Sequence, residues 1–210
     1  MFKPTSDSVA ALGTSLLIAC ITVVVCLLLA VPAGYALGRR RLPGRRLILL
    51  ILLLPQAFPN LAAYFNIARL FYMVGLNGTI AGVVLVHAVH GLVIAWIAAA
   101  AFAAIDPELE LAARNIGASA RRTVLTVTLP LAMPGVTASA IFVFLESLDE
   151  FTGTYFVGVP DVTTLPLVMF TASLAGNYQI AAITALVLLV PSVGFMLLIE
   201  RFLKPKCWPK

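Results

Sequence analysis

The sequence predicts an all-α integral membrane protein with about five spanning helices, and composition, hydropathy and segment length all support this fold class. Hydrophobic residues make up 61% and charged residues 11% of the 210-residue chain, against roughly 45–50% and 25% in soluble domains. The mean hydropathy is +1.05. Because a helix needs about 20 apolar residues to cross a bilayer, uncharged stretches of that length define the predicted helices of a single membrane domain over residues 1–210.

The predicted helices follow from these uncharged stretches in chain order. They cover about residues 10–37, 47–72, 79–104, 131–150 and 179–202. The first is too long, and too far from a cleavage site, to be a signal peptide. Pro55 and Pro59 interrupt the second helix and remove backbone donors, which is tolerated at membrane depth where the backbone lines a cavity or finds protein partners.

The basic residues predict the orientation, because Lys and Arg are retained on the cytoplasmic side of a membrane. Twelve of the 14 fall on one side: Arg39, Arg40, Arg41, Arg45, Arg46, Arg114, Arg121, Arg122, Arg201, Lys204, Lys206 and Lys210. Only Lys3 and Arg69 fall on the other, so we expect the N-terminus outside and the C-terminus in the cytoplasm. The arginines around Leu42-Pro43-Gly44 are also where anionic membrane lipid or nucleic acid would bind, but a topogenic role is preferred and no nucleic-acid partner is expected.

A polar segment over residues 105–130 lies on the arginine-rich side and predicts two short helices. Asp106 suits the N-cap of the first, with Pro107 at its first helical position. Gly117 is placed to end that helix in a left-handed turn, and Ser119 to cap the second. The segment is therefore an ordered cytoplasmic loop between the third and fourth spanning helices.

The first of these short helices has one apolar face. Its members recur at helical spacing and include two alanines: Leu109, Ala112, Ala113 and Ile116. Glu110 and Arg114 are spaced to pair on the opposite side. An amphipathic helix lying on the bilayer is the alternative interpretation, but such helices usually carry larger apolar anchors than alanine. The small residues favour docking against another protein.

This segment resembles the EAA loop of ABC importer permeases, which reads glutamate-alanine-alanine, three residues, glycine, nine residues, isoleucine, one residue, leucine-proline. The matching positions are Ala112, Ala113, Gly117, Val127, Leu129 and Pro130, with Ala118 beside the glycine. Leu111 occupies the glutamate position, and Glu110 lies one residue earlier, about 100° around a helix. Glu110 is therefore not expected to inherit the role of the family glutamate.

The resemblance implies that the loop inserts as a coupling helix into a groove of a separate ATPase subunit, which binds ATP and Mg. The chain itself has no Gly-x-x-x-x-Gly-Lys-Ser/Thr loop, so no catalytic residue, cofactor or enzymatic activity is expected in it. The resemblance also implies a type I importer permease fold in the bacterial inner membrane. Its implied partners are ATPase subunits, a second permease subunit, identical or different, and an extracytoplasmic solute-binding protein.

Two further stretches, residues 54–65 and 147–170, are similar to spermidine/putrescine permeases, which implies a polyamine substrate. Other substrates of this importer class, such as iron, thiamine or phosphonate, remain alternatives. Family members commonly begin with one more helix, so five spans are expected here instead of six. Asn60 and Tyr64 follow the proline break, where polar residues either line the pathway or hold the bundle by interhelical hydrogen bonds.

The densest acidic cluster is Glu146, Asp149 and Glu150, at the outer end of the fourth predicted helix. All three could face one side of a continuing helix and attract a cation, or they could end the helix at the interface or pair with Arg69. His87 and His90 lack a third ligand, so packing and hydrogen bonding are expected and a metal site is not. An ion-coupled secondary transporter and a membrane enzyme are disfavoured, because neither an internal repeat nor a catalytic constellation is evident.

Overall fold

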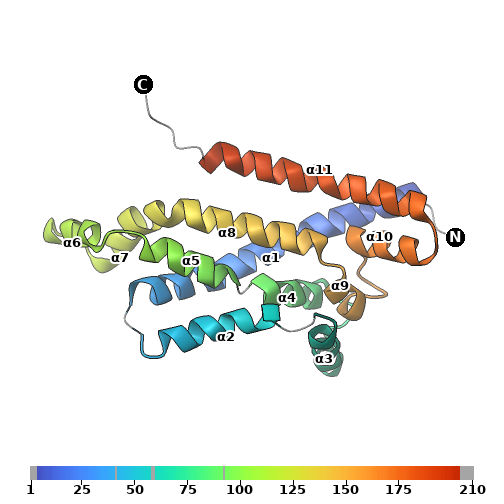
Figure 1. The fold of residues 1–210 in the computed structure, drawn as a ribbon, viewed down its shortest axis with the longest axis horizontal. Coiled ribbons are helices and arrows are strands. Elements are labelled where there is room, and N and C mark those ends of the chain that lie inside the picture. Colours follow the sequence, from blue (N-terminus) through green and yellow to red (C-terminus); the bar gives the residue numbers. More distant parts are fainter. Residues whose placement is uncertain (1–3, 41, 58–59, 92, 204–210) are drawn as a thin grey trace.

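Helices make up the regular structure of this protein in a computed structural model that describes residues 4–40, 42–57, 60–91 and 93–203, with no strand among them. The helices are α1 (Pro4–Arg39), α2 (Arg45–Ala57), α3 (Asn60–Met73), α4 (Ile80–Gly91), α5 (Val93–Ala103), α6 (Pro107–Asn115), α7 (Ala120–Thr123), the π-helical η1 (Val124–Thr128), α8 (Leu129–Asp149), α9 (Thr152–Val157), α10 (Leu165–Leu174) and α11 (Tyr178–Leu203). The long helices α1, α8 and α11 run roughly side by side (Figure 1). The predicted all-α membrane fold is confirmed.

Three stretches of the described chain are long and apolar enough to cross a membrane: Ser8–Arg39, Ala120–Asp149 and Tyr178–Leu197. A fourth span is present if α4 and α5 count as one, since Ile80–Val89 and Val93–Ala103 form a pair bent by 52°. The predicted first, third and fifth helices therefore correspond to α1, to the bent pair α4–α5 and to α11.

The second predicted helix, residues 47–72, is wrong as a single helix. It is two helices, α2 with 13 residues and α3 with 14 residues. Each is only about 20 Å long, shorter than the roughly 30 Å apolar layer. Figure 1 shows α3 turned out of the line of α2. Pro59, which was expected to interrupt the helix, lies outside the described residues.

The fourth helix begins much earlier than the predicted residue 131. A continuous helical stretch runs from Ala120 through η1 to Asp149, so the second short helix of the loop is the first part of this span. The backbone N–H of Leu129 bonds to the carbonyl of Val124, five residues back. Pro130 has no backbone N–H and its ring crowds the carbonyl four residues before it, and the wider π turn accommodates this without ending the helix. Helices α9 and α10, between the last two spans, were not predicted.

Small residues bring α1 and α5 into close contact. A Cβ atom placed on Gly34 would lie 2.6 Å from the Cβ atom of Ala98, and one on Gly38 would lie 2.6 Å from the carbonyl oxygen of Ala99. The two glycines are four residues apart and share one face of α1, the spacing that lets helix backbones approach in membranes. Tyr35 packs edge-on against Phe102 at 5.5 Å beside this contact. The α1–α5 pair is therefore the tightly packed centre of the bundle.

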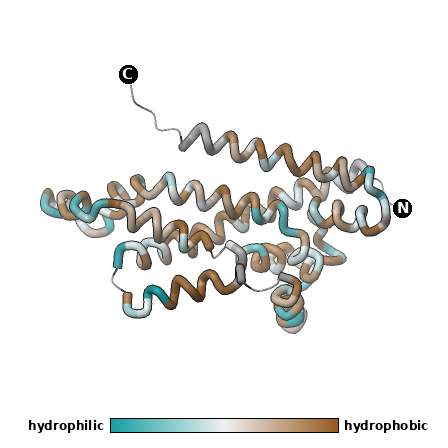
Figure 2. The backbone as a smooth tube through the Cα atoms, in the orientation of Figure 1, coloured by the Kyte–Doolittle hydropathy of each residue, from teal (hydrophilic) through white to brown (hydrophobic). Residues whose placement is uncertain are grey.

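The outer surface is apolar along the middle of the molecule and polar at its ends. Figure 2 shows hydrophobic colour along much of α2 and α11, and hydrophilic colour around α6 and α7. Leu50 of α2 is 63% exposed and Val190 of α11 is 72% exposed. Apolar side chains on the outside are what a lipid-facing surface requires, since bilayer hydrocarbon replaces water there.

The two ends of the bundle differ in charge. The C-terminal end of α1, the N-terminal end of α2, and α6 with α7 lie at one end, and the N-terminus, α9 and α10 lie at the other (Figure 1). The arginines of these segments thus gather at one end, which we call the basic end. They are Arg39, Arg40, Arg45, Arg46, Arg114, Arg121 and Arg122.

Candidate functional site

Helix α6 and the turn after it form the first candidate site, and the local signals in the sequence build them. The Asp106 side chain accepts a 2.9 Å hydrogen bond from the Glu108 N–H, and Pro107 begins the helix. Gly117 ends it with φ +92°, and the Ala118 N–H bonds back to the Ala113 carbonyl at 3.1 Å. Ser119 then caps the next helix, as its Oγ accepts from the Arg122 N–H at 3.3 Å. The predicted caps and glycine stop are confirmed.

Helix α6 contains no buried residue. Leu111, at the position of the family glutamate, is 56% exposed, and Ile116 is 87% exposed. Ala112 is exposed and Ala113 half-buried. The remaining loop positions lie nearer the bundle: Ala118, Val127 and Leu129 are half-buried, and Pro130 is exposed at the start of α8. An apolar surface without cover thus projects from the basic end.

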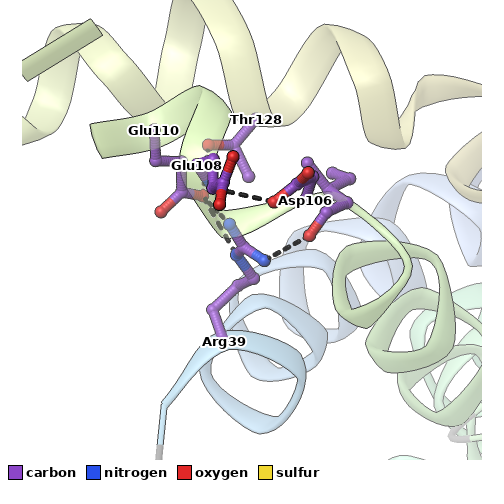
Figure 3. A network of polar contacts seen from close by, with 6 residues as sticks. Arg39, Asp106, Glu108, Glu110 and Thr128 are labelled. Atoms are coloured by element: carbon purple, nitrogen blue, oxygen red, sulfur yellow. Dashed lines mark hydrogen bonds and ion pairs between the residues drawn. The ribbon is translucent and has the colours of Figure 1, made fainter. Parts of the chain in front are cut away.

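A polar network holds α6 to the rest of the chain (Figure 3). Two nitrogens of Arg39 converge on Glu110 Oε1, Nη2 at 2.8 Å and Nε at 3.0 Å. Thr128 Oγ1 donates to the same oxygen at 2.7 Å, and Arg39 Nη1 donates to the Ile105 carbonyl at 2.6 Å. Glu110 therefore pairs with Arg39 of α1, not with Arg114 as its spacing suggested. We call Arg39, Glu110 and Thr128 the brace.

The brace is a shielded ion pair. The Arg39 and Glu110 side chains are only 9% and 15% exposed. Charge-assisted hydrogen bonds of this kind contribute about 1.5–3 kcal/mol each, and more is lost when one partner is removed alone. The network joins the last turn of α1 to α6 and to η1, so these three elements are held together at the basic end. The sequence offered Arg39 only as one basic residue among several.

The second candidate site is the acidic cluster at the opposite end. Glu150 accepts a 2.9 Å hydrogen bond from the Tyr64 hydroxyl and another at 2.9 Å from the Gly153 N–H. Of the alternatives for the three carboxylates, one shared helical face does not hold for Glu150, because α8 ends at Asp149 and Glu150 has an extended backbone. Glu146 and Asp149 are exposed, whereas Glu150 is half-buried and joins α3 to α9.

Asp149 also borders a cleft between α8, α10 and α11. The cleft has a volume of about 200 Å³, and its other lining residues are Leu148, Met169, Ala185, Leu188, Leu189 and Ser192. Tyr64 is fully buried on the α3 side of the same end. Asn60 begins α3, but its side chain lies outside the described set. The structure thus brings Tyr64 and Glu150 together and leaves Glu146 and Asp149 open to their surroundings.

His87 of α4 contacts residues within and just after the acidic segment 146–150. Its Nδ1 is 2.8 Å from Ser147 Oγ and its Nε2 is 3.0 Å from Thr154 Oγ1, and all three side chains are buried. The prediction of a packing and hydrogen-bonding role is confirmed, since His87 joins α4 to α8 and α9. The described residues contain no group of three or more side chains able to hold a metal ion. The His90 side chain lies outside that set.

Most of the chain matches one known protein family. Residues 30–206 match the family described as binding-protein-dependent transport system inner membrane component. The chain belongs to this family. It is therefore a multi-pass permease subunit of an ABC importer, and ATP hydrolysis takes place in a separate ATPase subunit. The predicted family and the absence of enzymatic activity from this subunit are confirmed by that membership.

Relatives of this permease carry several different substrate names. The molybdenum transport system permease protein ModB of Haemophilus influenzae is 33% identical over 184 residues, 78% of this chain and 79% of its own. The trehalose transport system permease protein SugB of Mycobacterium tuberculosis is 31% identical, covering 91% and 72%. The putrescine transport system permease protein PotI of Escherichia coli K12 is 28% identical, covering 89% and 70%. Family membership therefore leaves the solute open.

Solved structures support the fold of the permease. A chain of the inward-facing MetNI methionine ABC transporter superposes with a TM-score of 0.79 at 18% identity, covering 97% of this chain and 98% of that one. A chain of an amino acid ABC transporter gives a TM-score of 0.68 at 19% identity, covering 95% and 94%. At such identities the likeness concerns the fold alone.

Proposed function

We propose that this permease subunit lines the translocation path together with a second permease subunit, identical or different, and that α6 docks into a groove of the separate ATPase subunit. The observation that carries this proposal is that α6 projects from the basic end without a single buried residue. Leu111 and Ile116 offer apolar contact area there, and Ala112 allows close approach. Burying these side chains against a partner removes apolar surface from water, which favours docking.

The brace supports a mechanical role for α6. A docked helix transmits movement only if it is tied to the spans, and Glu110 is tied to Arg39 at the end of α1. Thr128 carries the same connection into the helical stretch that continues as α8. A displacement of α6 by the ATPase is therefore passed to α1 and α8 together. In this proposal Glu110 acts within the permease, while Leu111 takes the docking position on α6.

The charge distribution supports an orientation with the basic end in the cytoplasm. Basic residues are retained on that side of a membrane, which places the N-terminus outside and the C-terminus inside. The opposite end, with α9, α10 and the acidic cluster, then faces the extracytoplasmic solute-binding protein. The proposed location is the bacterial inner (cytoplasmic) membrane.

For the solute we propose a polyamine. Glu146 and Asp149 are exposed carboxylates at the end where solute would enter, and they favour a cation. Glu150 is already bonded to Tyr64 and Gly153, so in this proposal it shapes the wall of the path instead of meeting the solute directly. The similarity to the putrescine permease gives independent support. Molybdate and trehalose, named for other relatives, are the alternatives the experiment must separate.

Cross-linking tests the docking proposal. A cysteine at Ile116, introduced after replacing Cys20, Cys26 and Cys207, should form a cross-link to the copurified ATPase subunit in membranes. A cysteine at Asn77, in the turn at the other end, serves as the matched control and should not. A failure of the ATPase subunit to copurify, together with transport driven by an ion gradient without nucleotide, would overturn the proposal.

Uptake by the reconstituted importer tests the solute. Vesicles containing both permease subunits, the ATPase and the solute-binding protein should accumulate labelled putrescine in the presence of ATP. The Glu146→Gln/Asp149→Asn double variant should reduce the uptake, while Glu108→Gln on α6 should not. ATP-dependent uptake of molybdate or trehalose in place of putrescine would reject the polyamine proposal and leave the permease assignment intact.

A further inference from the structure

The arginine-rich hairpin between α1 and α2 contains more positive charge than the brace uses. Within the described part of the chain, Arg39 forms the only ion pair, with Glu110. Arg40, Arg45 and Arg46 have no carboxylate partner there, and the Arg45 Nε atom is buried without a hydrogen-bond partner. A buried guanidinium nitrogen without an acceptor is costly, so this position favours an anion supplied from outside the chain.

A groove begins at Arg46 and runs along α2. It is lined by Arg46, Leu49, Leu50 and Leu53 of α2 and by Trp96 of α5, and its volume is about 290 Å³. The four α2 residues recur at the spacing of one helical face and span about 10 Å along the axis. Leu50 and Trp96 are 63% and 43% exposed. The groove is thus apolar along its length and cationic at one end.

The backbone adds to the positive potential at that end. Gly44 has φ +71°, and α2 begins at the next residue with no acidic side chain in its first turn. The first N–H groups of a helix have no intrahelical acceptor, and the helix dipole favours an anion beside them. Arg46 and the helix N-terminus therefore lie where the apolar groove reaches the basic end, and Arg45 is the first residue of the same helix.

We propose that this groove binds one anionic phospholipid, with its phosphate on Arg45, Arg46 and the first turn of α2. One acyl chain then lies along Leu49, Leu50 and Leu53 and contacts the Trp96 ring. Arginine suits this ligand because its planar guanidinium binds phosphate oxygens in pairs. Basic pockets between spanning helices at the membrane surface are a recognised mode of binding for anionic head groups.

The same charges argue against a second permease copy as the occupant. Two copies in one membrane share the same orientation, so a twofold contact through this groove would place the arginine ends of both chains at the same depth. Each would meet the other's positive charge and gain no counterion. An anionic lipid neutralises the arginines and fills the apolar part of the groove in one step. This inference depends on membrane insertion and not on the proposed docking of α6.

Fluorescence quenching by brominated lipid tests the proposal on the full chain in its complex. Trp96 becomes a site-specific probe when the second tryptophan, Trp208, is replaced by phenylalanine and tryptophan-free partner subunits are used. Brominated phosphatidylglycerol should quench Trp96 more strongly than brominated phosphatidylcholine at equal lipid fraction. The Arg45→Gln/Arg46→Gln variant should lose this preference, with relative affinity for phosphatidylglycerol falling about tenfold.

Two controls make the result decisive. Arg121→Gln/Arg122→Gln removes the same charge from the same end but away from the groove, and it should keep the preference for phosphatidylglycerol. Leu50→Gln leaves the arginines in place and should weaken quenching by both lipids. Equal quenching by the two lipids in the unaltered chain, or an unchanged preference in the Arg45→Gln/Arg46→Gln variant, would overturn the proposal. If neither brominated lipid quenched Trp96 fluorescence, the proposal would also be overturned, because a protein would then cover the groove.

Discussion

Arg39 Nη2 lies 2.8 Å from Glu110 Oε1, and this contact joins residues 71 positions apart in the chain. The pair links the last turn of the longest span to α6, a helix with no buried residue. Both side chains are largely shielded, so removing one partner alone leaves an uncompensated charge and costs more than breaking a surface ion pair, which typically contributes under about 1 kcal/mol. The structure therefore gives the permease a rigid connection at the place where the ATPase is proposed to act.

Separating the brace residues should weaken the coupling of ATP hydrolysis to transport. Glu110→Gln is expected to lower the free energy of unfolding by about 2 kcal/mol, because Arg39 keeps its charge without a counterion. Solute-stimulated ATPase activity of the assembled importer should fall as well. The exchanged pair Arg39→Glu/Glu110→Arg should recover part of both losses. The coupling is measured as the number of ATP molecules hydrolysed per solute molecule transported. An unchanged ratio in Glu110→Gln would contradict this role.

Replacing Gly117 should disturb the exposed turn without preventing membrane insertion. Gly117 has φ +92°, and no atom lies within 4 Å of a Cβ placed on it, so Gly117→Val introduces backbone strain and no clash within the chain. The strain is about 1–2 kcal/mol. Stimulated ATPase activity is expected to be lost while the amount of inserted protein is unchanged. Gly176→Val provides the matched control, since Gly176 has φ +74° and an equally open environment at the other end.

Removing the Tyr64 hydroxyl should loosen the acidic end. Tyr64→Phe deletes the 2.9 Å hydrogen bond to Glu150 and leaves a half-buried carboxylate with fewer donors. The expected loss of stability is about 2 kcal/mol, measured as the free energy of unfolding of the purified protein in detergent. Tyr72→Phe in the same helix is the control, because Tyr72 is 77% exposed. Equal stability of the two variants would show that this bond contributes little.

Enlarging Gly34 should separate α1 from α5. A side chain there meets Ala98, whose Cβ would lie 2.6 Å from the new Cβ, and overpacking of this kind costs about 1–3 kcal/mol. Gly34→Leu is expected to lower the thermal unfolding midpoint and the yield of folded complex. Gly13→Leu in the same helix has no atom within 4 Å of its new Cβ and should be tolerated. A similar midpoint for both variants would argue against close helix packing at Gly34.

Cysteine labelling in whole cells should establish the orientation. A cysteine at Arg121 is expected to resist a membrane-impermeant maleimide until the membrane is opened, whereas one at Asn77 should react in intact cells from which the outer barrier has been removed. Both are introduced into a chain without its own cysteines. The reverse pattern of labelling would place the basic end outside and reject the proposed topology.

Much of the architecture follows from local chemistry. Long apolar stretches predict spans because each backbone group in hydrocarbon must be bonded within its own helix. The caps at Asp106 and Ser119 and the stop at Gly117 involve neighbours only a few residues away, so spacing alone identified them. Family membership was also evident at this level, since the alanine pair, the glycine and Leu129-Pro130 lie within one short segment.

Tertiary structure decided everything that depends on distant partners. Glu110 had a spacing suited to Arg114, but the packing of α1 against α5 delivers Arg39 to it instead. The sequence groups Glu150 with Glu146 and Asp149. In the structure α8 ends before Glu150, which lies beside Tyr64 instead. The sequence by itself determined that this chain is a helical membrane permease with an ordered exposed loop. Which charges meet was set by the three-dimensional packing, because contacts across 71 or 86 residues leave no periodic signal in a chain.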